Sequence, residues 1–227
     1  MLDATAVTTD PMLPEPLPVD PMPLFQEWFR DASARRAQPN PDSMIVATTA
    51  TSGEPSARVV LCKRVDVGGG YVVFFTNYES RKGRELAARP RAAAVFHWDA
   101  LHRQVRIEGP VVRSPESESD QYFASRAPDS RVAAWASAQS EPLASRAVLE
   151  QRVREFGARF GIAPGATSGT VPRPPHWGGH RLWVDRIELW TEGAHRVHDR
   201  AVWTRSLQRA DDHSFVGGSW RSTRLNP

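Results

Sequence analysis

From residue 44 onward, apolar and polar residues alternate in short segments that follow one another through turns. A period of two residues is typical of half-buried β-strands. The expected strands are 44–49, 57–65, 71–76, 92–98, 104–113, 180–190, 196–204 and 214–225. Because helices do not alternate regularly with these strands, the pattern predicts a mainly β fold with flanking helices. The sheet or barrel should be antiparallel, and a doubly wound parallel sheet is disfavoured.

Helical spacing is confined to a few segments. An apolar stripe predicts a helix that begins at Asp20-Pro21 and ends near residue 36. Further helices are expected from Ser80, after Ser114-Pro115-Glu116 and over 143–160. Residues 1–19 contain four prolines and little periodicity, which predicts a mobile arm. The remaining chain, 20–227, is expected to form a single domain.

The composition excludes several classes of protein. With 8 Trp, 9 Phe and 3 Tyr among 227 residues, the chain carries too much aromatic surface for a disordered coil. No run of about 18 uncharged apolar residues occurs, so no membrane-spanning helix is expected. The net charge is only +3 without a block of like charges, which argues against nucleic acid as a partner. One cysteine, Cys62, excludes an internal disulfide. Without a secretory signal, the expected location is the cytoplasm.

Only two of the 29 basic residues are lysines, Lys63 and Lys82, and both lie in clusters of functional interest. Lys63 ends the segment Arg58-Val59-Val60-Leu61-Cys62-Lys63, a predicted strand. Arg58 and Lys63 project from opposite faces of such a strand. Two cations on a mostly apolar strand require anionic partners on both faces, or exposure at the strand ends, and both interpretations stay open.

Lys82 lies where a predicted strand ends and a capped helix begins, in Thr76-Asn77-Tyr78-Glu79-Ser80-Arg81-Lys82-Gly83. Free backbone N–H groups, the Ser80 hydroxyl and the adjacent cations Arg81 and Lys82 form an arrangement suited to bind phosphate. Cations at a helix N-terminus oppose the helix dipole, and a bound anion would offset that repulsion. The alternative is an ordinary N-cap followed by a solvated basic turn.

A third cluster consists of Tyr122, Arg126 and Ser130, which follow at intervals of four. On a continuous helix they would form one stripe of phenol, guanidinium and hydroxyl donors, a set suited to phosphate. Pro128 interrupts that spacing, so the stripe is only suggested.

A fourth cluster is Arg196, His198 and Arg200, which would project together from one face of a strand. Two guanidinium groups beside an imidazole are unfavourable unless an anion or a π-system lies among them. A metal site at His195 and His198 is disfavoured, because neither a cysteine nor a third histidine stands at ligand spacing. Phosphate-binding loops, nucleophile elbows and dinucleotide fingerprints are absent from the sequence.

Together these motifs resemble the pyridoxamine 5′-phosphate oxidase family. The matching segments are 58–63, 76–83, 103–109, 122–130, 135–140, 177–179 and 196–200, within a similarity that extends from about residue 20 to residue 227. The resemblance implies a Greek-key split β-barrel that binds FMN. It implies a homodimer with each FMN at the subunit interface, to which 172–227 contribute. It also implies oxidation of pyridoxamine or pyridoxine 5′-phosphate to pyridoxal 5′-phosphate, with O2 reduced to H2O2.

The same resemblance implies roles for individual residues. FMN would be held by Arg58, Val59, Val60, Leu61, Lys63, Phe75, Thr76, Ser80, Arg81, Lys82, Gln104, Gln139, Ser140, Trp190 and Arg200. The substrate phosphate would be held by Lys63, Tyr122, Arg126 and Ser130. Arg196 and His198 would be the catalytic, substrate-binding pair that faces the ring and the reacting carbon. No metal is implied.

Several departures from the family pattern leave the substrate open. Residues 1–19 contain neither Arg nor Tyr, Thr191 stands where Gln is common, and Ala127-Pro128 replaces a Pro-first pair. The phenazine-pathway flavin oxidases share the fold and act on larger aromatic compounds, so they are the main alternative. Two others are a non-catalytic flavin carrier and a nucleic-acid-binding barrel. The retained phosphate-binding residues favour a phosphorylated substrate.

Overall fold

The computed structural model describes residues 12–227, which form five α-helices and eleven strands. In chain order these are α1 (Met22–Ala34), β1 (Ser43–Thr49), β2 (Pro55–Asp66), β3 (Tyr71–Asn77), α2 (Arg81–Ala88), β4 (Arg91–Trp98), β5 (Arg103–Arg113), α3 (Glu116–Ser125), α4 (Pro128–Ala136), α5 (Arg146–Phe160), β6 (Trp177–Trp183), β7 (Arg186–Thr191), β8 (Asp199–Thr204), β9 (Leu207–Arg209), β10 (Phe215–Gly217) and β11 (Arg221–Arg224).

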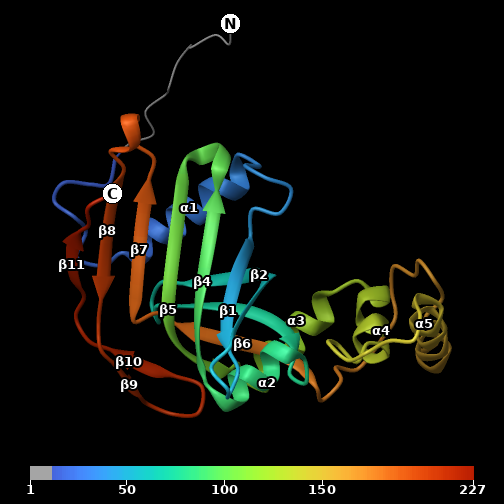
Figure 1. Ribbon diagram of the computed structural model, residues 1–227. Coiled ribbons are helices and arrows are strands. Elements are labelled where there is room, and N and C mark those ends of the chain that lie inside the picture. Colours follow the sequence, from blue (N-terminus) through green and yellow to red (C-terminus); the bar gives the residue numbers. More distant parts are fainter. Residues whose placement is uncertain (1–11) are drawn as a thin grey trace, which may run out of the picture.

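Six strands close into an antiparallel barrel (Figure 1). The order is β5-β4-β1-β2-β3-β6, and β6 pairs back with the end of β5. Consecutive turns join β1, β2 and β3, whereas β4 returns through α2 to lie beside β1. The resulting order β4-β1-β2-β3 is a Greek key. The expectation of a mainly β, antiparallel split barrel with flanking helices is therefore confirmed.

The expected strand 180–190 is two strands, β6 and β7. Its middle leaves the ladder at Val184 and Asp185, whose N–H groups donate to the carbonyls of Gly70 and Glu108. The break allows β6 to pair with β3, while β7 pairs with the first half of β5. β8 and β11 then extend this second sheet beyond the barrel. The sequence pattern could not show the break because both strands are apolar and adjacent.

The last two expected strands are also shorter or divided. Residues 196–198 do not join β8, because His195 and Arg196 form a turn with φ angles of 57° and 65° that a strand does not permit. The expected strand 214–225 divides into β10, which pairs with β9, and β11, which pairs with β8. The prediction of one continuous strand is therefore wrong for 214–225, whereas 196–204 does form one strand, which begins only at Asp199.

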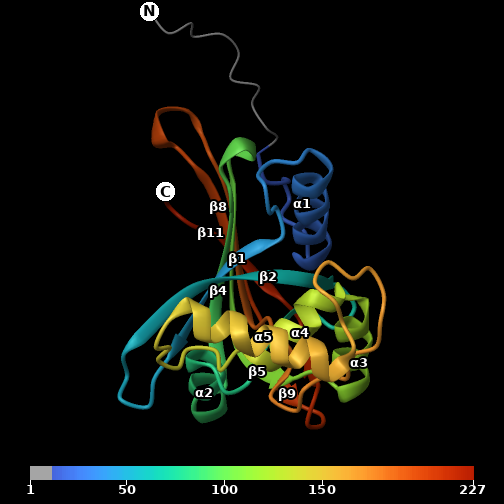
Figure 2. The same ribbon diagram turned by 90° about the vertical axis from the view of Figure 1, so that its right-hand side faces the viewer.

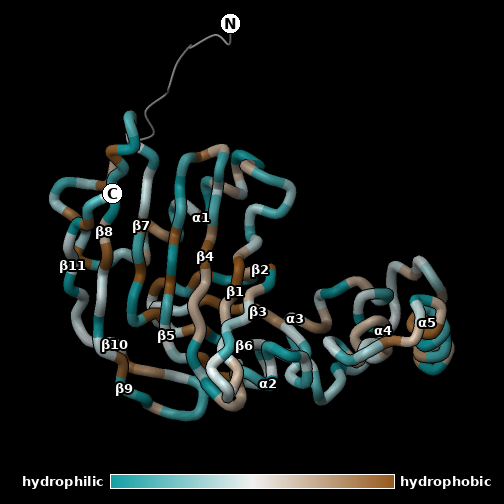
Figure 3. The backbone as a smooth tube through the Cα atoms, in the orientation of Figure 1, coloured by the Kyte–Doolittle hydropathy of each residue, from teal (hydrophilic) through white to brown (hydrophobic). Residues whose placement is uncertain are grey.

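The main core fills the barrel and extends beneath α1. Apolar residues recur along the barrel strands (Figure 3). Phe25 of α1 packs on Phe96 of β4 with ring centroids 5.2 Å apart, and both side chains are fully buried. Trp98, at the end of β4, donates its indole N–H to the Pro41 carbonyl at 2.8 Å. These contacts explain why the stripe predicted for residues 20–36 forms a helix against the sheet.

The N-terminal part of the described chain lies against β8 and β11. The Leu13 side chain is buried, and its backbone N–H donates to Asp199 at 2.9 Å. Arg224 bonds both Asp199 and Glu15, and Trp203 donates to the Pro18 carbonyl at 2.8 Å. A mobile arm was expected over residues 1–19. Residues 1–11 of this segment lie outside the described part of the structure.

Three helices, α3, α4 and α5, lie to one side of the barrel (Figures 1 and 2). The break between α3 and α4 falls at Arg126 and Ala127, so Tyr122 and Ser130 do not share one continuous helix. Trp135 of α4 packs on Phe156 and Phe160 of α5. No described helix has the length and apolar character needed to cross a membrane.

Candidate functional site

A cleft of about 720 Å³ lies between β2, β3, α2 and the segment that carries α3 and α4. Its lining contains most of the residues expected to hold the cofactor. These are Arg58, Val59, Val60, Leu61, Lys63, Phe75, Thr76, Arg81, Lys82, Gln139 and Ser140. Tyr122 and Arg126, expected at the substrate, line the same cleft, together with Ser56, Ala57 and Trp177. Residues from distant parts of the chain therefore meet in one cavity.

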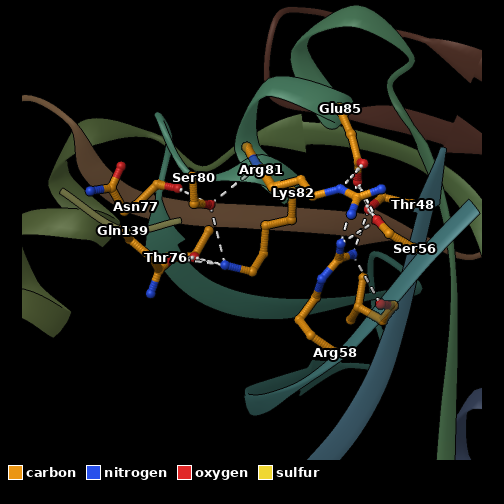
Figure 4. Close-up of polar contacts among 12 residues, drawn as sticks. Thr48, Ser56, Arg58, Thr76, Asn77, Ser80, Arg81, Lys82, Glu85 and Gln139 are labelled. Atoms are coloured by element: carbon orange, nitrogen blue, oxygen red, sulfur yellow. Dashed lines mark hydrogen bonds and ion pairs between the residues drawn. The ribbon is translucent and has the colours of Figure 1, made fainter. Parts of the chain in front are cut away.

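Lys82 is a buried cation among the residues that line this cleft, and its contacts are shown in Figure 4. Its ammonium group donates to Thr76 Oγ1 at 2.8 Å, to Gln139 Oε1 at 2.8 Å and to Ser80 Oγ at 3.2 Å. All three partners are neutral, so no described carboxylate compensates the charge. Burial, with the nearby charge of Arg58, lowers the pKa of Lys82 to about 8. An uncompensated buried cation of this kind is suited to bind an anion.

The local sequence explains how Lys82 reaches this position. Ser80 is the N-cap of α2, and its hydroxyl accepts from the Gly83 N–H at 3.3 Å. At Gly83 a Cβ would lie 2.0 Å from the Tyr78 carbonyl oxygen, so only glycine permits this tight entry into the helix. Ser80 itself does not line the cleft, and it acts through the cap and through its contact with Lys82.

Lys63 lies near the C-terminal end of β2 and forms an ion pair with Asp42. Its ammonium group is 2.6 Å from Asp42 Oδ2, and about a quarter of each side chain is exposed. The neighbouring apolar side chains point outward, since Val59 is 64% exposed and Leu61 is 38% exposed. Ile45, directly opposite Val59 in the β1–β2 ladder, is exposed as well. This part of the barrel thus presents an apolar strip beside the cleft.

Aromatic rings and one guanidinium group also line this cleft. Tyr122 stacks on Phe75 with ring centroids 3.9 Å apart, and Arg126 lies 4.8 Å from the ring centroid of Trp177. Arg126 Nη1 is buried without a hydrogen-bond partner among the described residues, and burial lowers the pKa of this arginine. Ser130 lies outside the main cleft, in an adjoining cavity of about 240 Å³ that Arg126 also lines. This second cationic position is separate from Lys82.

The remaining expected residues form a different group on β5, β7 and β8. Gln104 pairs with Trp190 across the β5–β7 ladder, and Trp190 pairs with Arg200 across the β7–β8 ladder. His198 packs on Trp190 with ring centroids 4.8 Å apart. Within one chain this group does not line the cleft.

The geometry corrects one expectation about this second group. Arg196, His198 and Arg200 do not project from one strand face, because β8 begins only at Asp199. Arg196 instead belongs to a turn, and the turn is closed by a 3.2 Å hydrogen bond from the Gly193 N–H to His198 Nδ1. Arg200 lies outside this turn, on β8, and donates to Glu188 at 2.8 Å.

Sequence reasoning missed several residues that shape the site. Asp42 contacts Lys63 across 21 positions, and no spacing rule would reveal that pair. Glu85 bonds Arg81 at helical spacing, so a search for i,i+4 ion pairs could have found it. Ser56 lines the cleft and was not expected there. Among residues 12–227, no cluster of three or more potential ligands could hold a metal ion.

The fold and the site together define a class: split-barrel proteins with a cationic cleft beside the barrel. The chain belongs to the pyridoxamine 5′-phosphate oxidase family. The family model "Pyridoxamine 5'-phosphate oxidase" matches residues 31–160, and the model "Pyridoxine 5'-phosphate oxidase C-terminal dimerisation region" matches residues 177–227. The family expected from the sequence motifs is therefore confirmed.

Individual relatives agree with this assignment. A pyridoxine/pyridoxamine 5′-phosphate oxidase of Paraburkholderia phymatum is 50% identical over 92% of this chain and 91% of its own length. The enzyme of the same name from Burkholderia vietnamiensis is 50% identical over 92% of this chain and 89% of its own length. The crystal structure of PhzG from Burkholderia lata 383, in complex with tetrahydrophenazine-1-carboxylic acid, has a TM-score of 0.82 and 30% identity. It covers 96% of this chain and 98% of PhzG.

Proposed function

We infer that this protein is an FMN-dependent oxidase that converts pyridoxamine or pyridoxine 5′-phosphate to pyridoxal 5′-phosphate, with O2 reduced to H2O2. Relatives of that name are 50% identical over most of the chain. The observation that carries the inference is a cleft with two separate cationic positions, at Lys82 and at Arg126, neither paired with a described carboxylate. Two phosphate esters, one on the cofactor and one on the substrate, match such a cleft.

The donor set around Lys82 fits the phosphate end of FMN. Lys82 and Arg81 lie at the N-terminus of α2, where a doubly negative phosphate is favoured. Arg58 to Leu61 and Phe75 would then line the rest of the cofactor, with Gln139 and Ser140 on the other side. When bound, FMN accepts the two electrons of the oxidation and passes them to O2.

Arg126 is proposed as the anchor of the substrate phosphate, with Tyr122, Ser130 and Lys63 as further ligands. Its Nη1 donor is free in the described structure, and hydrogen bonds to a charged phosphate are stronger than neutral ones. Tyr122 is held by its stacking on Phe75, so its position is already fixed. An anchored phosphate would hold the reacting carbon in a defined place and supply orientation.

A homodimer would bring the second group of residues to the cleft. The matched C-terminal model is a dimerisation region, which supports self-association, and the exposed Ile45, Val59 and Leu61 offer an apolar contact surface. We propose that residues 172–227 of one subunit reach the cleft of the other subunit. This segment would bring Trp190, Arg196, His198 and Arg200 to that cleft. Each site would then combine two chains.

Within this combined site, Arg196 and His198 are proposed to orient the substrate and to stabilise charge that changes at its amine or hydroxyl. The Gly193 N–H donates to His198 Nδ1, so a neutral ring carries its proton on Nε2. His198 is thereby a donor at Nε2. A Cβ on Gly193 would lie 1.8 Å from the Val197 carbonyl oxygen, so this turn depends on glycine.

A second candidate function is oxidation of a larger aromatic compound in a phenazine-type pathway. It is favoured by the similarity to PhzG over nearly the full length of both chains. The proposal for a vitamin B6 phosphate rests on the higher identity to the oxidases of that name and on the unpaired Arg126.

Anaerobic mixing of FMN-loaded protein with pyridoxamine 5′-phosphate tests the proposed function. We expect the flavin absorbance to bleach, and to bleach far more slowly with unphosphorylated pyridoxamine at the same concentration, because the phosphate anchors would be empty. Tightly held FMN that is not bleached by pyridoxamine 5′-phosphate would contradict the proposal and favour the pathway-oxidase alternative. A colourless protein that binds no FMN would contradict both.

Replacing Asp42 with asparagine should strengthen binding of the phosphorylated substrate. Asp42 competes with a substrate phosphate for the Lys63 ammonium group, and the Asp42→Asn change removes the competing charge. Because the pair is partly exposed, we expect only a roughly two- to fivefold decrease in KM for pyridoxamine 5′-phosphate, with kcat unchanged. Steady-state kinetics measure both.

Two controls accompany this measurement. The KM for unphosphorylated pyridoxamine should not move in Asp42→Asn. Asp185→Asn removes a similar ion pair, with Arg91 at 2.8 Å outside the cleft, and should leave both KM values unchanged. An increased KM for the phosphorylated substrate in Asp42→Asn would show that Asp42 assists substrate binding instead.

A further inference from the structure

We propose that Glu85 is a positioning residue that fixes Arg58 and Arg81 for the cofactor phosphate before the cofactor binds. Glu85 does not line the cleft but lies behind its wall, on α2, with 6% of its surface exposed. Arg58 and Arg81 both line the cleft. The inference rests on the proposed function, because it takes the phosphate of FMN as the ligand of Arg58, Arg81 and Lys82.

The Glu85 carboxylate is the centre of a hydrogen-bond network (Figure 4). Its Oε2 atom accepts from Thr48 Oγ1 at 2.5 Å, from Ser56 Oγ at 2.6 Å and from Arg58 Nη2 at 3.3 Å. Its Oε1 atom accepts from Arg81 Nε at 2.9 Å. Each oxygen thus holds one of the two arginines.

The two hydroxyl groups transmit the position of Glu85 to Arg58. Arg58 Nη1 donates to Thr48 Oγ1, and Arg58 Nη2 donates to Ser56 Oγ, each at 2.5 Å. An ionised carboxylate can only accept, so each hydroxyl directs its single proton to Glu85 and accepts from Arg58. The hydrogen bonds that link Arg58 to Glu85 therefore all run toward Oε2, which accepts each of them.

The charge state of Glu85 agrees with this geometry. Burial alone would favour the neutral acid, but hydrogen bonds from Ser56, Thr48 and Arg81, with the charge of Arg58, outweigh it and lower the pKa of Glu85 to about 2. The carboxylate is therefore ionised across the working range of an enzyme. It removes one unit from the combined charge of Arg58, Arg81 and Lys82, and the net double positive charge that remains matches a doubly negative phosphate monoester.

Pre-organisation is the physical benefit of this arrangement. Arg81 is 57% exposed, and without Glu85 its side chain would be free to turn into solvent. Without the carboxylate, Arg58, Arg81 and Lys82 would also repel one another. A ligand that must first order such side chains binds more weakly than one that finds them in place.

Two substitutions separate the roles of the two carboxylate oxygens. In Glu85→Gln, the amide oxygen can still accept from the Thr48 and Ser56 hydroxyls, which leaves the amide NH2 facing Arg81 Nε, donor to donor. This variant releases Arg81 alone, whereas Glu85→Ala releases both arginines. The loss of FMN affinity should therefore be graded, about threefold for Glu85→Gln and about tenfold or more for Glu85→Ala.

The test is titration of FMN and of riboflavin into apoprotein, followed by quenching of flavin fluorescence. Riboflavin lacks the phosphate, so its affinity should stay within about twofold of wild type in both variants. Glu150→Gln is the matched control, because Glu150 bonds Arg146 Nε at 2.8 Å with the same helical spacing on α5. It should change neither affinity. Circular dichroism of each apoprotein reports whether the fold is retained.

The outcomes are distinct. An equal loss of affinity for FMN and riboflavin would show a general structural role and overturn the inference, as would unchanged FMN affinity in both variants. If Glu85→Ala does not fold, the comparison of the two flavins in Glu85→Gln decides alone. Wild-type apoprotein that binds neither flavin would overturn the proposed function and this inference with it.

Discussion

Lys82→Met lowers the affinity of the apoprotein for FMN roughly 10- to 100-fold, the range expected when a charge-assisted hydrogen bond to phosphate is lost. Methionine matches the apolar stem of lysine and lacks the ammonium group that Thr76, Ser80 and Gln139 now hold. Equilibrium dialysis or fluorescence titration at pH 7 measures the affinity.

The pH dependence gives this prediction a second readout. The pKa of Lys82 is lowered to about 8, first by burial and then by the charge of Arg58. A bound phosphate dianion favours the protonated ammonium, so binding takes up a proton where free Lys82 is neutral. FMN affinity should consequently fall as the pH rises through about 8 in wild type, and this part of the profile should disappear in Lys82→Met.

The stability of the apoprotein should change with pH in the opposite direction to its affinity for FMN. Because the pKa of Lys82 is lower in the folded apoprotein than in the unfolded chain, the unfolded state binds more protons between about pH 8 and the ordinary lysine pKa of about 10.4. The apoprotein should gain stability with rising pH in that window, and Lys82→Met should lack this gain. Arg89→Met, an exposed cation at the end of α2, is the control. If it matched Lys82→Met in FMN affinity, Lys82 would have no special role.

The sequence predicted the barrel well because its strands carry strict local patterns. The segments 44–49, 57–65, 71–76, 92–98 and 104–113 correspond to β1 to β5 within two residues at either end. Each is bounded by turns or helix caps that sequence alone reveals. The C-terminal strands were predicted poorly, because the break at Val184–Asp185 and the turn at Ala194–Arg196 depend on contacts with residues distant in sequence.

The candidate site shows a similar division. Motif resemblance identified Lys82, Gln139 and Arg126, and the structure brings all three to the same cleft. It did not identify Asp42 or Glu85, which act through other side chains rather than on a ligand. Such residues are defined by three-dimensional contacts, so local pattern carries little information about them. Helix α4 was not predicted from the sequence. Pro128 was interpreted as a break in a helix, whereas it occupies the first turn of a new helix.

Mixed dimers provide the strongest test of a site shared between subunits. We expect Lys82→Met dimers to lose activity at subsaturating FMN through weak cofactor binding, and Arg196→Ala dimers to lose at least about tenfold in turnover through loss of a charged contact. Co-expression of the two variants with different affinity tags allows dimers that contain one chain of each to be purified. Activity is then measured per dimer at a fixed FMN concentration.

The mixed dimer should recover activity well above either parent, because one of its two sites would combine an intact Lys82 cleft with an intact Arg196 from the other chain. Its second site would carry both defects. If Lys82 and Arg196 of the same chain served one site, each site would keep one defect and no activity would return. Lys82→Met mixed with Arg126→Ala is the matched control: both residues line the cleft of one chain, so this pair should not recover. Recovery in the control pair, or none in the test pair, would contradict a site built from two chains.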